Sequence, residues 1–436
     1  MFENKDWIYS IYLINQFKYI FILLTNYIKM ENLPSESITD IYNYISDKNI
    51  KIYDTKLDQF DIINQYLEKK KGEHSFILVD LGDIIRQYYR WKKNLPCVIP
   101  YYAIKCNPCP IIIEILDKLG CCFDCASQQE ILQTINLNVD PKKIIFANPC
   151  KSVDYIKFSR SNDVDLLVID SCYELFKIKL YHPEAEILVR IQVDDSKSIC
   201  KFNCKFGVEL ENVKEILEMG KTLKLNIVGV SFHVGSGCED ANVYWTALVD
   251  CKKIFDIADE LNIKMNIIDI GGGFPGTSQH KVSFESMAEV INKGINEIFS
   301  REQGIKFIAE PGRYFVASSH TLVCSIINKK EKVNKENGEK LITYYLSDGV
   351  YKSFSNIIFD YAKPIFIPFN ERNEKTYPSI LYGESCDSLD IISRECQLPS
   401  LAIGESIVVQ NMGAYTTASS TEFNGFYKAE LYFILT

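Results

Sequence analysis

The stretch VIPYYAIK, residues 98–105, has the composition of a buried strand and ends on a charged side chain. Its aromatic and branched apolar residues favour a strand. Lys105 follows them directly, although lysine is usually kept in water. A functional role for an amine at the end of a strand is therefore the first question that this sequence raises.

Seven further runs repeat this pattern along the chain. They are CCFDCA (121–126), IIFANP (144–149), LLVIDS (166–171), EILVRIQV (186–193), IVGVSFHVG (227–235), IIDIGGG (267–273) and KFIAEPGR (306–313). Between the runs, apolar residues recur at helical spacing, as in Ile112, Ile115 and Leu116. Buried strands that alternate with helices are typical of a (β/α)8 barrel. The sequence therefore predicts an α/β fold with such a barrel over residues 80–316.

The chain changes character after this region. Short strand-like runs separated by turn residues replace the helical spacing. Examples are HTLVCSIINKKE (320–331), KLITYYLSDG (340–349) and ESIVVQNMG (405–413). The pattern predicts an all-β domain, a β-sandwich or β-barrel, over residues 317–436. Residues 41–79 are expected to belong to the same domain and to supply a strand, and residues 1–40 to form an N-terminal extension.

The composition limits the partners and the compartment. A net charge of −9 argues against nucleic acid or an acidic membrane surface as the main partner. Fifteen cysteines, an odd number without the spacing of a disulfide framework, indicate reduced thiols in a cytoplasmic protein. Cys106 and Cys109 form a CxxC pair, but no second pair completes a set of zinc ligands, so no metal site is predicted.

Residues 7–28 are apolar and aromatic, but polar side chains such as Asn15 and Lys18 interrupt them. No small-residue cleavage site is obvious. We expect an amphipathic extension that packs on the body of the protein. The sequence leaves two alternatives open, which are a membrane anchor and a true start at Met30.

Charged, polar or glycine residues stand at the end of nearly every predicted strand. They are Lys105, Asp124, Asn148, Asp170, Arg190, His233, Ser236, Gly271, Gly272, Gly273, Glu310 and Arg313. In a parallel barrel the carboxyl ends of the strands meet at one face, and active sites are built there. The sequence therefore predicts a site at that face, made of residues from several strands.

Three loops at this face predict the binding of a phosphate group. The glycines of DIGGGFPG (269–276) let backbone N–H groups approach an anion closely. EPGR (310–313) adds a guanidinium, and HVGSG (233–237) adds a hydroxyl. A run of glycines alone is also consistent with a tight turn. Its place beside EPGR favours the anion, because loops after the seventh and eighth strands of such barrels often hold phosphate.

A lysine at a strand end and a nearby phosphate site together suggest pyridoxal 5′-phosphate, bound as a Schiff base to Lys105. The amine must be neutral to attack the aldehyde, and a partly desolvated site favours that form. Glu310 ends a strand near the phosphate loop, so it is the candidate partner of the pyridine nitrogen. His233 is the candidate imidazole that stacks on the cofactor ring.

Ten blocks between residues 76 and 427 resemble eukaryotic ornithine decarboxylases, in order. They are PYYAIKCN, FDCAS, FANPCK, DDSKSICKFNCKFG, SFHVGSGC, DIGGGFPG, AEPGRYFVAS, SDGVYKSF, CDSLD and NMGAYTTASSTEFNGF. The resemblance implies an alanine-racemase-like barrel with a C-terminal β domain, pyridoxal 5′-phosphate as cofactor, and a homodimer with active sites shared between subunits. It also implies decarboxylation of L-ornithine to putrescine and carbon dioxide, the first step of polyamine biosynthesis.

The same resemblance implies roles for individual residues. Catalytic roles fall on Lys105, His233, Glu310 and Cys386, and cofactor contacts on Asp124, Arg190, Ser236, Gly271, Gly272, Gly273, Pro311, Gly312, Arg313 and Tyr415. Asp360 and, from the other subunit, Asp387 would bind the distal amine of the substrate. Cys386, also from the other subunit, would help return a proton to the substrate carbon. Phe359 stands where tyrosine is common in the family, which leaves exact substrate preference open.

Two other functions are compatible with this sequence. One is a decarboxylase that acts on lysine, or on ornithine and lysine together. The other is a non-catalytic homologue that binds an antizyme-like regulator, as antizyme inhibitors do. A non-catalytic homologue is expected to lose cofactor contacts, whereas all the cofactor residues named above are present here.

Overall fold

The computed structural model describes residues 35–436 apart from 49, 54–56, 70–71, 303 and 337. The chain divides into residues 1–50, which contain helix α2 (Ser35–Asp47), and residues 51–436. In the described part of the chain, no helix is long and apolar enough to cross a membrane. The apolar stretch 7–28 lies outside the described residues.

A closed barrel of eight parallel strands forms one half of the larger unit, as the sequence predicts. Its strands are β3 (Val98–Ala103), β4 (Cys122–Cys125), β5 (Ile144–Phe146), β6 (Leu166–Ile169), β7 (Glu186–Ile191), β9 (Asn226–Phe232), β11 (Ile267–Asp269) and β12 (Lys306–Ala309). Each strand pairs in parallel with its neighbours, and β12 closes the ring against β3. Every predicted run therefore contains one barrel strand.

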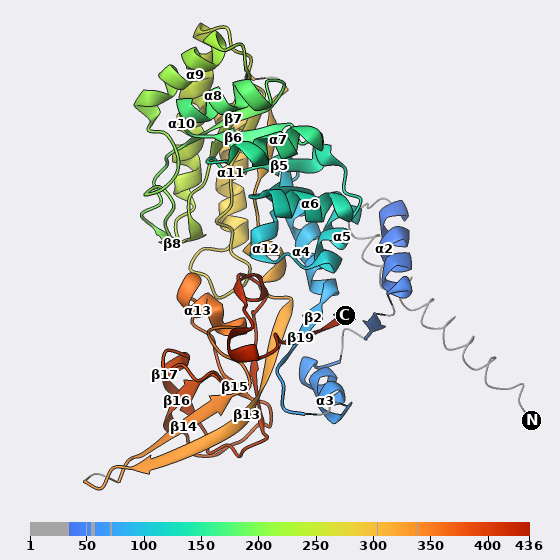
Figure 1. Cartoon of the computed structure of the whole chain (residues 1–436), viewed down its shortest axis with the longest axis vertical. Helices are drawn as coiled ribbons and strands as arrows, with labels where there is room; N and C mark the ends of the chain where they lie inside the picture. The colour runs from blue at the N-terminus through green and yellow to red at the C-terminus, as the bar shows by residue number, and fades with distance from the viewer. Residues whose placement is uncertain (1–34, 49, 54–56, 70–71, 303, 337) are drawn as a thin grey trace, which may run out of the picture. The chain divides into compact units, whose positions relative to one another are not determined.

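Helices cover the barrel on the outside, where Figure 1 shows α7 and α8 beside β5, β6 and β7. The helices of this region are α4 (Leu81–Asn94), α5 (Pro110–Lys118), α6 (Gln128–Asn136), α7 (Val153–Ser161), α8 (Cys172–Tyr181), α9 (Val213–Thr222), α10 (Asn242–Glu260), α11 (Phe284–Ile298) and α12 (Arg313–Val316). Short polar residues begin several of them. The side chains of Asp80, Ser127, Ser152 and Ser283 accept hydrogen bonds from backbone N–H groups in the first turn.

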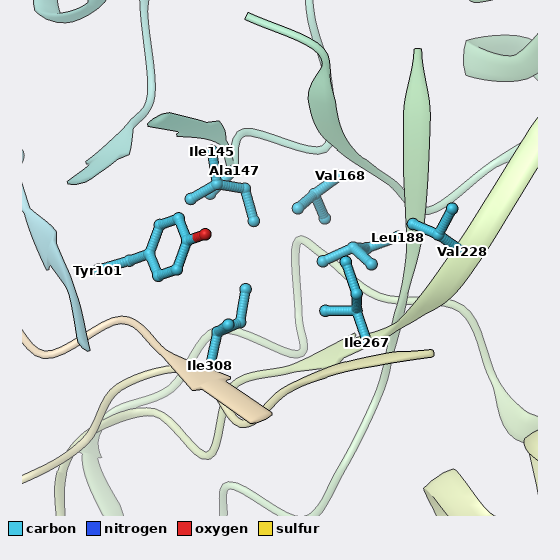
Figure 2. Packing of buried hydrophobic residues seen from close by; sticks show 8 residues of the cluster. All are labelled: Tyr101, Ile145, Ala147, Val168, Leu188, Val228, Ile267 and Ile308. Atoms are coloured by element: carbon cyan, nitrogen blue, oxygen red, sulfur yellow. The ribbon is translucent and has the colours of Figure 1, made fainter. Parts of the chain in front are cut away.

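The interior of the barrel is filled by side chains, so the barrel is a packed core and no pore. Figure 2 shows one layer of this core. Seven of its side chains come from seven different barrel strands, and the eighth, Ala147, follows β5 directly. Its members are Tyr101, Ile145, Ala147, Val168, Leu188, Val228, Ile267 and Ile308. The layer supports the carboxyl ends of the strands, where the charged residues stand.

The other half of the unit is a mixed sheet of nine strands, which is the predicted β domain. Its strands are β1 (Lys51–Ile52), β19 (Glu430–Leu435), β2 (Phe76–Asp80), β13 (His320–Val333), β14 (Lys340–Leu346), β16 (Tyr377–Tyr382), β17 (Ile391–Leu398), β18 (Ser406–Val409) and β15 (Ile367–Pro368). Figure 1 shows β13 and β14 as two long neighbouring strands. Strands β1 and β2, which precede the barrel in the chain, join this sheet. Helix α3 (Gln59–Lys69) buries Ile62 and Ile63 in its apolar core.

Short elements near the site complete the fold. They are the antiparallel pair β8 (Ser198–Cys200) and β10 (Ser236–Cys238), the one-turn helix α13 (Asn356–Phe359), and the 3-10 turns η1 (Ile104–Cys106), η2 (Pro141–Lys143), η3 (Leu210–Asn212), η4 (Ser353–Ser355), η5 (Thr417–Ser419) and η6 (Phe423–Gly425). Turn η1 follows β3 directly and carries Lys105. The amine therefore stands just beyond the last residue of its strand.

Candidate active site

Two adjoining cavities lie at the carboxyl ends of the barrel strands, because Ser236 and Arg313 line both of them. The smaller is lined by Ala103, Lys105, His233, Ser236, Gly273, Phe274, Glu310, Gly312, Arg313 and Tyr415. The larger has a volume of about 600 Å³ and is bounded by Cys200, Asn356, Asp360 and Met412, among others. Its volume is in the range of small-molecule sites.

Lys105 forms an ion pair with Asp124, which is fully buried. The register of β3 and β4 explains this pair, because Ala103 lies opposite Asp124 and Lys105 follows two residues later. The Nζ atom contacts one carboxylate oxygen of Asp124, while the other oxygen, Oδ1, is buried without a hydrogen-bond partner. A buried acceptor without a partner points to a missing donor, such as a bound ligand.

The charge state of Lys105 differs from the sequence-based expectation. Burial lowers the pKa of this amine, but the carboxylates of Asp124 and Glu310 outweigh burial and raise the pKa above its usual value. The free amine is therefore held in its charged form. The expectation that desolvation favours the neutral amine was wrong, because the sequence does not show that Asp124 pairs with it.

Glu310 follows β12 and is nearly fully buried. Its backbone N–H donates to the carbonyl of Gly271 at 2.6 Å, which ties the Glu310 loop to the glycine loop. Burial and the nearby carboxylates of Asp269 and Asp124 raise the pKa of Glu310 well above its usual value. The carboxyl group of Glu310 therefore binds a proton more readily than an exposed glutamate does.

Asp269 is a site residue that sequence reasoning missed. It is fully buried at the end of β11, and its carboxylate accepts hydrogen bonds from Ser231 Oγ and the Gly271 N–H, both at 2.9 Å. It also hydrogen bonds with the side chain of Glu310, and burial raises the pKa of Asp269 to about 6. The signal in the sequence is its place as the first residue of DIGGGFPG, two residues before the first glycine.

His233 and Arg190 approach the site from neighbouring strands. The Nδ1 atom of His233 accepts the Gly235 N–H at 3.0 Å, so the other ring nitrogen carries the proton in the neutral ring. Burial, Arg190 and Lys105 together lower the pKa of His233 well below its usual value. The Arg190 guanidinium is buried over the ring of Phe206, at 5.2 Å from its centroid. The imidazole is therefore a neutral ring in a cationic environment.

The glycine loop forms a close backbone wall of the smaller cavity. Gly273 has φ +108°, and a Cβ atom built there would lie 2.7 Å from the carbonyl oxygen of Gly235. A Cβ at Gly272 would lie 2.9 Å from Nε2 of His233. Larger residues would thus fill the space that faces His233 and Gly235. That Gly271, Gly272 and Gly273 offer backbone groups to an anion stays a prediction.

Arg313 opens α12 and is the cation of this wall. It donates to Ser236 Oγ at 2.8 Å, and its guanidinium carbon lies 5.1 Å from the ring centroid of Tyr415. Gly312, before it, packs closely on Cys106, because a Cβ at Gly312 would lie 3.0 Å from the Cβ of Cys106. The carbonyl of Pro311 accepts the N–H of Ala103 at 3.2 Å. Segments far apart in the sequence therefore meet around one guanidinium.

Asp360 lies at the end of α13 and pairs with Arg313 through both carboxylate oxygens, at 2.9 Å and 2.6 Å. The pair is mostly buried, with 15% of the Arg313 side chain and 9% of the Asp360 side chain exposed. Sequence reasoning gave these residues separate tasks, phosphate for Arg313 and the substrate amine for Asp360. It did not predict that they bind each other.

Three predicted site residues lie away from these cavities. Neither Cys386 nor Asp387 lines the two cavities; Cys386 is exposed, and Asp387 is half-buried and accepts a hydrogen bond from Tyr351. Phe359 does not line them either and is 68% exposed. A single chain therefore assembles the Lys105 side of the predicted site without these three residues.

The residues of the smaller cavity fit pyridoxal 5′-phosphate. They offer an amine at Lys105, a buried carboxyl group at Glu310, a neutral ring at His233, and a guanidinium beside the glycine loop at Arg313. The orphaned oxygen of Asp124 and the glycine wall are observations of this fold that favour a bound polar ligand. The chemistry of this set of groups matches what the cofactor needs.

Comparison with known families identifies the class. Residues 81–317, which hold the barrel, match the family described as "Pyridoxal-dependent decarboxylase, pyridoxal binding domain". The cofactor of this domain is pyridoxal 5′-phosphate, as the sequence analysis expected from Lys105 and the phosphate loops.

Individual relatives define the family more narrowly. The probable ornithine decarboxylase of Dictyostelium discoideum is 44% identical over 382 residues, which cover 86% of this chain and 82% of that protein. Antizyme inhibitor 2 of Xenopus laevis is 42% identical over 383 residues, 86% of this chain and 84% of that protein. The arginine decarboxylase of Paramecium bursaria Chlorella virus shares the fold with a TM-score of 0.81 and 33% identity, over 86% of this chain and 100% of that one. The chain belongs to the eukaryotic ornithine decarboxylase family of fold type III pyridoxal-phosphate decarboxylases.

Proposed function

We propose that this chain is an active ornithine decarboxylase, which converts L-ornithine to putrescine and carbon dioxide in the first step of polyamine biosynthesis. One observation carries the proposal. Lys105 lines the same cavity as Glu310, His233 and Arg313, at the carboxyl ends of the barrel strands. A scaffold that only binds another protein does not need an amine opposite two buried acids.

Each residue of the cavity has a task in this reaction. The chemistry that pyridoxal phosphate supplies when bound is an electron sink for the charge left at Cα when carbon dioxide leaves. Lys105 would hold the cofactor through Nζ. Glu310 would pair with the pyridine nitrogen, His233 would limit tilting of the ring, and Arg313 would hold the phosphate. Asp124 gives its carboxylate to Lys105, so the amine is oriented before the cofactor arrives.

Substrate recognition rests on Asp360, which borders the larger cavity. A carboxylate that is 9% exposed favours a ligand with a positive charge, because an unpaired buried charge is costly. The distal ammonium of ornithine supplies that charge. Lysine, one methylene longer, is the alternative substrate, and a hydrophobic-size difference of one methylene discriminates only weakly.

A second copy of the chain completes the site in this proposal. The loop of Cys386 and Asp387 is exposed and surrounded by large exposed apolar side chains, which include Leu389 at 70% and Tyr427 at 77%. Such side chains favour burial against a partner. In a homodimer, Cys386 and Asp387 of one subunit would enter the larger cavity of the other. There Cys386 would deliver a proton to Cα and Asp387 would share the distal ammonium with Asp360.

The experiment is release of carbon dioxide from L-ornithine and from L-lysine by the purified protein with pyridoxal phosphate, in parallel with Lys105→Ala. We expect turnover of ornithine, much weaker turnover of lysine, and none by the variant. Turnover of lysine at a comparable rate would contradict the proposed preference for ornithine. If neither amino acid is turned over and pyridoxal phosphate causes no absorbance change, the proposal that this chain is an enzyme is refuted.

A second candidate is a protein that binds an antizyme-like regulator without catalysis. The specific observation in its favour is the similarity to antizyme inhibitor 2, at 42% identity. The absorbance test separates the two, because only the enzyme requires the cofactor at Lys105. We also propose a cytoplasmic location, since the fifteen cysteines, all in the described part of the chain, form no disulfide.

A further inference from the structure

Arg313 and Asp360 form an end-on ion pair that both proposed subsites need to break. One guanidinium nitrogen donates to Asp360 Oδ2 at 2.9 Å, and the other donates to Asp360 Oδ1 at 2.6 Å and to Ser236 Oγ at 2.8 Å. A phosphate placed against Ser236 would meet the same nitrogen. An ammonium bound by Asp360 would meet oxygens that already accept from Arg313.

The surroundings give Asp360 little else to bind. Among the residues that the structure describes, Arg313 is the one cation paired with Asp360. Its other close polar neighbour is the thiol of Cys200, at 3.9 Å from Oδ1. A carboxylate that leaves Arg313 therefore needs a new cation, because a buried charge without a partner is destabilising.

The backbone around Asp360 allows the carboxylate to move without disturbing the barrel. Asp360 ends α13, a helix of a single turn, and its N–H donates to Asn356 at 3.0 Å. Tyr361, which follows, has φ +54° in the left-handed region. A short segment of this kind rearranges at lower cost than a strand of the barrel.

We propose that Asp360 exchanges between two cations, Arg313 and the ammonium group of the substrate, and that a phosphate group on Arg313 drives the exchange. The proposal rests on the proposed function and adds to it that the cofactor phosphate builds the substrate site. Asp360 competes with phosphate for Arg313, so it lowers the affinity for the cofactor. A phosphate on Arg313 frees Asp360, so it raises the affinity for a diamine. By linkage, a diamine bound at Asp360 raises the affinity for the phosphate by the same factor.

The first test removes the competing carboxylate with Asp360→Asn. We expect pyridoxamine 5′-phosphate to bind this variant about tenfold more tightly than the wild type, the usual size of such couplings. Inorganic phosphate should raise the unfolding temperature of the variant more than that of the wild type. Glu239→Gln is the matched control, because Glu239 lines the larger cavity and pairs with Lys281, away from Arg313. Equal affinities in the wild type and Asp360→Asn would overturn the exchange.

The second test needs only the wild-type protein and therefore does not depend on folding of a variant. Putrescine affinity is measured by calorimetry with pyridoxamine 5′-phosphate and with pyridoxamine, which lacks the phosphate. We expect putrescine to bind about tenfold more tightly with the phosphorylated form. Equal putrescine affinities would overturn the exchange and leave the proposed function standing. Failure of pyridoxamine 5′-phosphate to bind at all would overturn both.

Discussion

The ion pair between Lys105 and Asp124 makes a prediction about the reactivity of the amine. The carboxylate of Asp124 is fully buried, and it raises the pKa of Lys105 against the effect of burial. The variant Asp124→Asn keeps the shape of the side chain and removes the charge. We expect its Lys105 to lose protons more readily, so that a larger fraction of the amine is neutral and nucleophilic near pH 8.

The magnitude follows from the geometry. Two unit charges about 4 Å apart interact with about 4 kcal/mol at an effective dielectric constant of 20. The Lys105 side chain is 42% exposed, so solvent screens the pair, and we halve this value to about 2 kcal/mol. That energy corresponds to about a thirtyfold increase in the neutral fraction. Glu310 remains in the variant and still favours the charged amine, which limits the increase in the neutral fraction.

The assay is competitive acetylation with a trace of acetic anhydride, which reacts only with neutral amines. The cofactor-free protein is labelled at several pH values, and the Lys105 peptide is quantified by mass spectrometry. The exposed Lys264 in the same sample is the internal standard. We expect about thirtyfold faster labelling of Lys105 in Asp124→Asn at pH 8. An unchanged rate would refute the reasoning, because it would mean that Asp124 does not control the charge of the amine.

Three further predictions concern the partner chain, the glycine wall and the buried acids. A mixture of Lys105→Ala and Cys386→Ala chains should regain part of the activity that each lacks, because each mixed dimer keeps one intact site. No recovery of activity after subunit exchange would contradict a shared site. Gly273→Ala should weaken pyridoxal phosphate binding and lower the unfolding temperature, by about 1–3 kcal/mol, because φ is +108° and the new methyl meets Gly235; an unchanged titration curve would count against the cradle. The raised pKa of Asp269, about 6, means that the folded chain binds more protons than the unfolded one between about pH 4 and pH 6. Stability should therefore fall as the pH rises through this interval, and Asp269→Asn should flatten the change in chemical denaturation; a slope equal to that of the wild type would exclude Asp269 as its source.

The barrel was predictable because its strands are buried on both faces. Such strands read as continuous apolar runs, and each run here contains one strand. The ends of the runs were less well defined. Strand β12 ends at Ala309 and β3 ends at Ala103, whereas the predicted runs continued to Arg313 and Lys105. The charged residues stand beyond the paired backbone, where the chain turns into loops.

The pairing of side chains was not predictable from the sequence. Lys105 and Asp124 meet because of the parallel register of β3 and β4, which periodicity does not specify. Arg313 and Asp360 belong to different halves of the unit and meet only when α13 packs near the barrel. The sequence therefore indicated which residue types gather at the site, but not which charges neutralise one another.

The balance of charges connects these observations. The buried acids Asp124, Asp269, Glu310 and Asp360 face the cations Lys105, Arg190 and Arg313. The acids exceed the cations by one, and burial together with the neighbouring carboxylates raises the pKa of both Asp269 and Glu310. A phosphate bound at Arg313 adds negative charge that this set of groups cannot neutralise. A substrate with a distal ammonium supplies the missing positive charge at Asp360, whereas a substrate without one leaves that carboxylate unpaired. Preference for a diamino acid then follows from the charge of the cofactor as much as from the shape of the pocket.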